Sequence, residues 1–174
     1  MTEQPEFSRP VKVEHMTPGN EIRKTIEPDQ AERDALVGRL GILGLDCLTA
    51  DVGVHRMAGG HLFRVEGRIV ADVVQRCVVT MAAVPGHIEE RFEELFALEG
   101  YEAPEDPDND DLPEVFDGHE IDIGELAAQI LSLVLDPFPR GQDAAVEPVA
   151  GGEANDEERR RPFEGLADML KKKN

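Results

Sequence analysis

The sequence is poor in aromatic and basic residues. Its 174 residues include no Trp and one Tyr, and 18 Lys and Arg stand against 37 Asp and Glu, which gives a formal net charge of −19. Phosphate contacts need a basic surface, so this balance counts against broad, non-specific nucleic-acid binding. It leaves room for a local basic patch or for a basic protein partner. The 40% of hydrophobic residues is enough for one core.

Long apolar runs and cysteine pairs are also lacking. No stretch approaches the roughly 18–20 apolar residues of a transmembrane helix, and residues 1–10 lack the basic-then-apolar order of a secretory signal. We therefore expect a cytoplasmic protein that makes no membrane contact. Cys47 and Cys77 form no Cys-x-x-Cys pair. Each is better explained as a small buried hydrophobe, and burial is expected to raise the pKa of the Cys77 thiol.

The usual signatures of catalysis are missing as well. The sequence contains no Gly-x-x-x-x-Gly-Lys-Ser/Thr, Gly-x-Gly-x-x-Gly, Gly-x-Ser-x-Gly or His-Glu-x-x-His motif. His55 and His61 flank the Gly59–Gly60 turn, where a surface pair is a better explanation than a metal or acid–base site. We predict no catalytic residue, no cofactor and no metal, and therefore a protein that is not an enzyme.

The clearest pattern is an alternation over residues 61–81, which predicts a long strand. Its apolar residues share one parity: Phe63, Val65, Ile69, Ala71, Val73, Cys77, Val79 and Met81. Arg64, Arg68 and Arg76 lie on the other parity, where they form either an RNA-binding patch or, the favoured reading, a solvated face with cross-strand ion pairs. Gly67 is expected to mark a bulge that lets the strand curl.

Other segments complete an α+β fold. Shorter strands are predicted at 11–13, 45–57, 88–98 and 114–121, with a helix as the competing reading of 88–98, and turns at 58–60 and 84–86. Helices are predicted at 26–43, with Pro28 in the first turn, and at 122–135, with Asp122 as N-cap and Glu125 completing a capping box. We expect a curled antiparallel sheet of five or six strands, in its strongest form barrel-like, packed against two main helices.

The chain is expected to form one domain over 1–140 with an acidic loop near 99–113. Nine acidic residues and no Lys or Arg occur from Glu102 to Glu120. This favours a solvated, disordered loop over a binding site for a basic partner or a cation. A flexible linker is predicted at 141–158, followed by a basic amphipathic helix at 159–174. That helix either docks on its own domain or serves as a linear motif for another molecule. Its basic residues are the candidates for phosphate contacts: Arg159, Arg160, Arg161, Lys171, Lys172 and Lys173.

Four motifs occur in a characteristic order. They are Val74-Gln75-Arg76-Cys77, Asp122-Ile123-Gly124-Glu125-Leu126, Leu135-Asp136-Pro137-Phe138-Pro139-Arg140 and Pro162-Phe163-x-x-Leu-x-x-Leu-Lys. Over roughly residues 65–173 the chain resembles the YceD family, the large ribosomal RNA subunit accumulation proteins. The resemblance singles out Arg76, Cys77, Asp122, Gly124, Glu125, Asp136, Pro137, Pro139, Arg140, Pro162, Phe163, Leu166 and Leu170. Many members carry Cys-x-x-Cys where this chain has Val74 and Cys77, so no metal or redox role is carried over.

The resemblance implies a bacterial cytoplasmic protein, or a chloroplast relative, that is needed for accumulation of large-subunit ribosomal RNA. We expect a non-enzymatic ribosome-biogenesis factor that binds ribosomal proteins, assembly factors or precursor ribosomal RNA, the RNA through the C-terminal tail. Two alternatives stay open: a metal-dependent RNA-processing enzyme and a chaperone-like adaptor for a basic client protein. The sequence leaves the oligomeric state open.

Overall fold

The computed structural model describes residues 5–101 and 112–142. The elements follow in the order β1 (Pro10–Lys12), β2 (Glu21–Ile26), α1 (Gln30–Leu40), β3 (Gly44–Arg56), β4 (Leu62–Arg76), β5 (Ala83–Leu98), β6 (Glu114–Phe116), β7 (Glu120–Asp122) and α2 (Ile123–Val134). The predicted linker at 141–158 and the C-terminal helix at 159–174 fall almost wholly outside the described residues, as does most of the acidic loop, so those predictions stay predictions.

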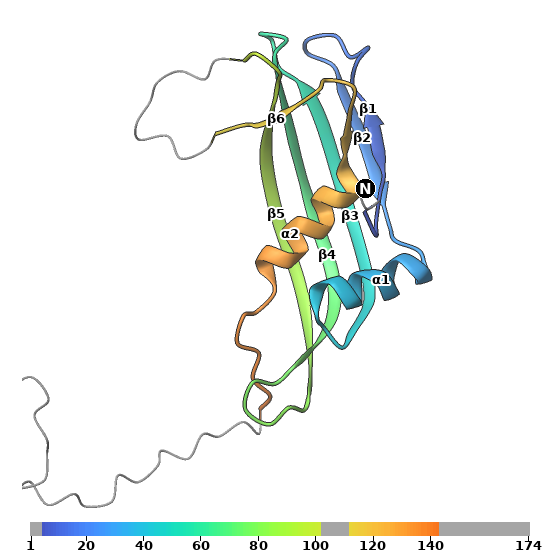
Figure 1. The fold of residues 1–174 in the computed structure, drawn as a ribbon, viewed down its shortest axis with the longest axis vertical. Coiled ribbons are helices and arrows are strands. Elements are labelled where there is room, and N and C mark those ends of the chain that lie inside the picture. Colours follow the sequence, from blue (N-terminus) through green and yellow to red (C-terminus); the bar gives the residue numbers. More distant parts are fainter. Residues whose placement is uncertain (1–4, 102–111, 143–174) are drawn as a thin grey trace, which may run out of the picture. The chain divides into compact units, whose positions relative to one another are not determined.

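A five-stranded sheet dominates the described part of the chain. Its strand order is β2-β3-β4-β5-β6, and β1 pairs with β7 in a separate two-stranded sheet (Figure 1). All neighbours are antiparallel except β5 and β6, which are parallel. The α+β class is therefore confirmed, but the sheet is mixed. It does not close into a barrel among the described residues, because β2 and β6 stand at opposite ends of the strand order.

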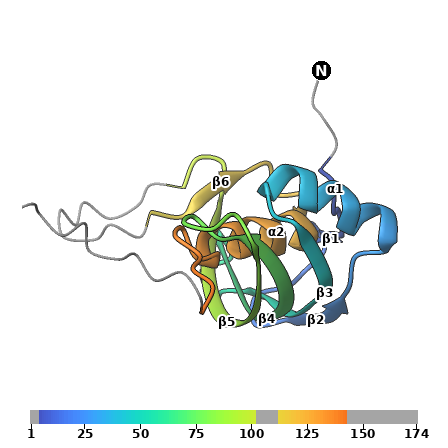
Figure 2. The ribbon, with the colours of Figure 1, turned by 90° about the horizontal axis from the view of Figure 1, so that it is seen from below.

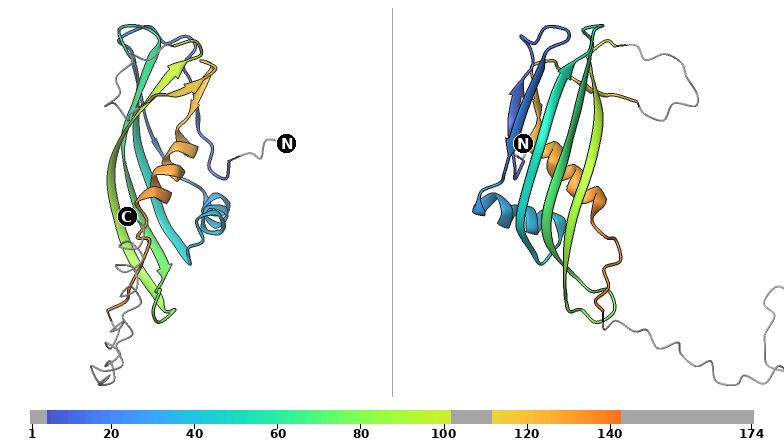
Figure 3. Two further views of the ribbon diagram at one scale, coloured as in Figure 1. Left: turned by 60° about the vertical axis from the view of Figure 1, so that its left-hand side comes forward. Right: turned by 180° about the vertical axis from the view of Figure 1, so that it is seen from behind.

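The core lies between the sheet and the helices. The three longest strands bend along their length, and α1 and α2 lie on the same side of them (Figures 2 and 3). Side chains that are at most 3% exposed alternate along β3 and β4: Leu48, Ala50, Val52, Val54, Phe63, Val65, Ile69, Ala71 and Val73. The buried stripe of α2 packs into the same cluster through Ile123, Leu126, Ala127, Ile130 and Leu131. The predicted parity of the long strand is thus confirmed as far as Arg76.

Several predicted boundaries are wrong. The first helix begins at Gln30, not at 26, because Ile26 ends β2, a strand that sequence reasoning missed. Pro28 therefore precedes the helix, and Asp29 caps it in a reciprocal capping box with Glu32. The segment 88–98 is a strand, as favoured, but β5 already starts at Ala83, so the predicted turn at 84–86 lies inside it. The predicted strand at 114–121 is two strands, divided at Gly118, which has a φ of 84°.

Gly67 has a different role from the predicted bulge. The register of β4 is continuous through Gly67 against both β3 and β5, and the one register shift lies between Leu45 and Cys47. A Cβ at Gly67 would stand 2.6 Å from the carbonyl oxygen of Asp51 and 2.7 Å from the ring of Phe92. The position therefore needs glycine because neighbouring strands fill the space that a side chain would take.

Candidate functional site at the hairpin end

Two motif segments that are about sixty residues apart in sequence meet at one end of the sheet. The Gln75 amide nitrogen donates to the carbonyl oxygen of Asp136 at 2.9 Å, and the Val78 N–H donates to that of Pro139 at 2.9 Å. Figure 1 shows the segment after α2 running beside the loop that joins β4 to β5. The structure thus brings these motif residues together at one end of the sheet: Arg76 and Cys77 with Asp136, Pro137, Pro139 and Arg140.

Local hydrogen bonds hold both segments in place. Asp136 caps its own turn by accepting the Phe138 N–H at Oδ1, 2.8 Å away, and Pro139 is buried. In the hairpin loop, the Cys77 N–H donates to the Ala82 carbonyl oxygen at 2.8 Å and the Met81 N–H donates to that of Cys77 at 3.0 Å. Met81 has a φ of 62°, which makes this tight turn a conformation that non-glycine residues seldom adopt.

Cys77 lies beneath this turn with its side chain fully buried. Its Sγ accepts the N–H groups of Val79 and Thr80, each at 3.4 Å. Hydrogen bonds from Thr80, foremost from its side chain, and from the Gly141 and Val79 backbone lower the pKa of the Cys77 thiol to about 6. The predicted burial is confirmed. The predicted upward pKa shift is wrong, because the surrounding donors outweigh the cost of desolvation.

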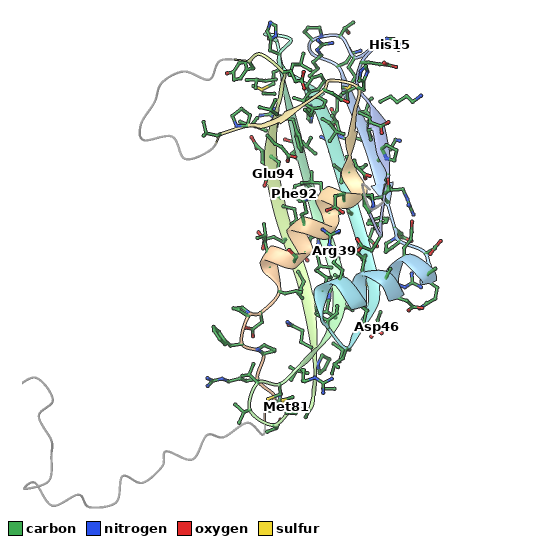
Figure 4. All side chains as sticks on the ribbon, in the orientation of Figure 1. His15, Arg39, Asp46, Met81, Phe92 and Glu94 are labelled. Atoms are coloured by element: carbon green, nitrogen blue, oxygen red, sulfur yellow. The ribbon has the colours of Figure 1, made fainter. Side chains whose placement is uncertain are left out.

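Large apolar side chains are exposed around the buried thiol. Val78 is 48% exposed, Val79 41%, Met81 61% and Phe138 69%. Figure 4 marks Met81 at the tip of the hairpin. We call these four residues, with the exposed Arg76 and Arg140, the hairpin-end surface. Apolar residues, Met and Arg at one exposed place are typical of protein interfaces.

Sequence reasoning missed the apolar half of this surface. The strand parity placed Val79 and Met81 in the core, but β4 ends at Arg76 and the chain turns there. One signal was present in the sequence: Phe138 stands between two prolines, outside any helical or strand period.

The arginines of the strand divide into two groups. Arg64 lies 3.8 Å from Glu66 and 4.0 Å from Glu93, and Arg68 lies 2.7 Å from Glu89. Those two therefore belong to an ion-paired sheet face, as the favoured reading had it. Arg76 and Arg140 have no carboxylate partner in the described part of the chain.

The second motif, at the start of α2, has a structural role. Asp122 accepts the N–H groups of Arg9, Gly124 and Glu125 at Oδ1, at 2.7, 2.9 and 3.1 Å. Its Oδ2 accepts the Ser8 hydroxyl at 2.5 Å. A Cβ on Gly124 would meet the Phe7 carbonyl oxygen at 2.7 Å, so glycine allows the helix to pack on the N-terminal segment.

Glu125 departs from its predicted role. It does not complete a capping box, because its carboxylate forms two hydrogen bonds to Arg39 of α1, at 2.6 and 2.7 Å. Arg39 also donates to Glu6 at 2.9 Å. The hydrogen bonds of Arg39 lower the pKa of Glu125. Asp122, Gly124 and Glu125 thus join the helices and the N-terminal segment, and these contacts account for the motif.

The remaining candidates lie elsewhere. His55 is on β3, within 3.6 Å of Glu21 and 3.3 Å of Glu66, and His61 is in the turn after it. No group of three or more His, Cys, Asp or Glu side chains with metal-binding geometry occurs within 5–101 and 112–142. None of the helices that the structure describes is long and apolar enough to cross a membrane. The predicted tail residues, from Arg159 to Lys173, lie outside the described residues.

The comparisons with known proteins agree with the motif order. The sequence model of the family described as large ribosomal RNA subunit accumulation protein YceD matches residues 65–170, more than half of the chain. This match begins in β4 and includes the hairpin end and α2, whereas β1 to β3 and α1 precede it. Searches of curated proteins and of solved structures found no match. The chain belongs to the YceD family of large ribosomal RNA subunit accumulation proteins.

Proposed function

We propose that this protein is a non-enzymatic ribosome-biogenesis factor that supports accumulation of large-subunit ribosomal RNA by binding ribosomal proteins or assembly factors. The observation that carries the proposal is the hairpin-end surface. Its apolar residues are exposed at the place where two family motifs meet. Exposed apolar clusters commonly mark binding sites. A partner that binds this surface would explain why both motifs lie there.

The polar motif residues support a binding role over a catalytic one. The Asp122 carboxylate is occupied by four hydrogen bonds, and Glu125 is held by Arg39. The Cys77 thiol is fully buried, so a substrate has no direct access to it in this conformation. These three motif side chains therefore have structural roles, which favours binding as the purpose of the motifs.

The charge of the chain favours a basic protein partner. With a formal net charge of −19, the surface attracts basic proteins and repels bare phosphate backbone. Such complementarity speeds encounter and selects among partners more than it adds affinity. The basic residues from Arg159 to Lys173 leave a route for RNA contact, which treatment of captured complexes with ribonuclease would separate from direct protein binding.

Affinity capture with three versions of the full chain tests this proposal. Met81→Ser with Phe138→Ser removes apolar area from the hairpin-end surface, and Leu133→Ser is the matched control, because Leu133 is 77% exposed on α2. We expect the wild-type and control chains to retain ribosomal proteins or assembly factors after ribonuclease treatment, and the double variant to lose them. Equal capture by all three versions, or loss of all partners with ribonuclease, would overturn the proposal.

A further inference from the structure

The fifth strand has a long free edge. β4 pairs with β5 from Leu62–Ala97 to Arg76–Ala83, along almost its whole length. On the other side, β6 pairs only with Phe96, Ala97 and Leu98. Among the residues that the structure describes, no strand pairs with this side of β5 from 83 to 95, and Figure 1 shows it as an outer strand of the sheet.

Such edges are ready templates for another strand, and proteins usually blunt them. Pro85 lacks an N–H and so weakens the start of this edge, but residues 87–95 contain no proline. They extend over about 30 Å at the rise of a β-strand. Half of their backbone N–H and C=O groups point away from β4, because successive groups alternate in direction along a strand.

The side chains of this edge are strongly acidic. Glu89, Glu90, Glu93 and Glu94 lie within six residues, against one arginine, Arg91. Glu89 and Glu93 share ion pairs with Arg68 and Arg64.

The other two glutamates stand on the opposite face of the strand. Glu90 and Glu94 flank Phe92 on the face that carries the core, and both are exposed, without an ion pair to any described residue. Figure 4 marks Phe92 and Glu94 on this strand. The pattern on this face is acid, aromatic, acid.

This charge argues against a second copy of the same chain as the occupant. Pairing of two β5 edges would bring eight glutamates together, and like charges across neighbouring strands are destabilising. The same charge attracts a strand whose side chains are basic. The edge is therefore protected against self-association and open to a partner of opposite charge.

We propose that the free edge of β5 binds an extended, basic segment of a partner protein as an additional strand. The inference rests on the proposed function, since it names the part of a basic partner that the protein would take up. The backbone of the segment would form the ladder with residues 87–95. Lysine or arginine at two positions four residues apart would face Glu90 and Glu94, and an apolar residue midway between them would contact Phe92.

A synthetic peptide tests this directly. The probe is the acetylated peptide Thr-Lys-Thr-Val-Thr-Lys-Thr-Val-Thr-Lys-Thr, and its affinity for the full chain is measured by isothermal titration calorimetry. We expect binding that weakens as salt is added. We also expect the Glu90→Gln/Glu94→Gln chain to bind about five-fold more weakly, as for the loss of two exposed ion pairs. The control, Glu14→Gln/Asp46→Asn, removes the same charge from sites off β5 and should change affinity less than about two-fold.

Backbone methylation separates strand addition from simple charge attraction. Two further peptides carry N-methyl groups either on the odd or on the even amides. Because only alternate amides face the edge, strand addition predicts that one methylated peptide binds and the other does not. Equal affinity of both would overturn the proposal, as would equal peptide binding by the Gln variant and its control, or a dimer that forms through β5 without peptide.

The outcomes also separate this inference from the proposed function. Failure of the peptide to bind, with ribosomal partners still captured through the hairpin-end surface, removes the edge proposal alone. Selective peptide binding without capture of any ribosomal protein or assembly factor contradicts the proposed function and leaves the edge as a binding site for basic segments.

Discussion

At the scale of single residues, Asp122 forms hydrogen bonds beyond the helix cap that its sequence motif predicts. One carboxylate caps α2 and also fixes Ser8 and Arg9 of the N-terminal segment. A helix cap alone stabilises a protein by about 1 kcal/mol. Removal of the carboxylate also leaves the Ser8 hydroxyl and the Arg9 N–H without this acceptor, which lowers stability further.

We expect Asp122→Ala to lower the free energy of unfolding by about 2 kcal/mol. Asp29→Ala, which removes the exposed cap of α1, is the matched control and should cost about 1 kcal/mol. Urea denaturation of both variants gives the comparison. An Asp122→Ala chain as stable as the Asp29→Ala chain would contradict the assigned role.

Substitution by alanine should change the stability of the protein in opposite directions at Gly67 and at Gly38. A methyl group at Gly67 would meet the Asp51 carbonyl oxygen and the Phe92 ring, whereas one at Gly38, inside α1, would meet nothing within 4 Å. Gly67→Ala should destabilise the protein by about 2 kcal/mol, and Gly38→Ala should stabilise it by about 0.5–1 kcal/mol. Thermal unfolding tests the signs, and a neutral or stabilising Gly67→Ala would show that the strands have room to move apart.

At the scale of elements, Arg39 connects the two helices. It binds Glu125 on α2 and Glu6 before β1, and its side chain is 32% exposed. Its hydrogen bonds lower the pKa of Glu125 in the folded state. Since the unfolded chain then binds more protons in acid, this contribution to stability is present above the ordinary pKa of glutamate and is lost as the pH falls through the lowered value.

Arg39→Gln should therefore cost about 1 kcal/mol at pH 7 and less in acid. The expected result is that the wild-type and variant stabilities approach each other as the pH falls from about 5 toward 3. Urea midpoints at several pH values measure this. A difference that stays constant or grows in acid would mean that the ion pair does not account for it.

Local patterns predicted some elements well. The apolar spacing and the cap of α2 located that helix within one residue at each end. Alternation located the start of β4, although not its end, and favoured the strand at β5. β2 was missed because its inward residues, Ile22 and Ile26, are separated by mostly exposed polar residues. The following Pro28 and Asp29 also suit a helix start. Local sequence therefore could not show that Ile26 belongs to an edge strand rather than to the helix.

The candidate site was predictable as a set of residues but not as an arrangement. The motifs singled out Arg76, Cys77 and the 136–140 segment. The contact between these segments depends on where the chain runs after α2, which no local pattern predicts. Strand parity carries no information on where a strand stops, which is why Val79 and Met81 were assigned to the core. The partner of Glu125 is 86 residues away in sequence, so no local pattern could reveal it.

At the scale of the whole molecule, surfaces of different chemistry lie apart. The sheet face is covered by cross-strand ion pairs such as Arg68–Glu89, the free edge of β5 is acidic, and the hairpin-end surface is apolar with two arginines. A basic partner can be attracted electrostatically by the free edge of β5 and can bury apolar area against the hairpin-end surface. This division fits the proposed role in large-subunit assembly.

The central claim, that the hairpin-end surface supports accumulation of large-subunit RNA, is tested most directly in cells of the source organism. The chromosomal copy is replaced by the Met81→Ser/Phe138→Ser or the Leu133→Ser version, and ribosomal particles are separated on sucrose gradients. We predict a shortage of large subunits and their RNA with the double variant, at normal protein level, and a normal profile with Leu133→Ser. A normal profile with a folded, normally abundant double variant would contradict the account.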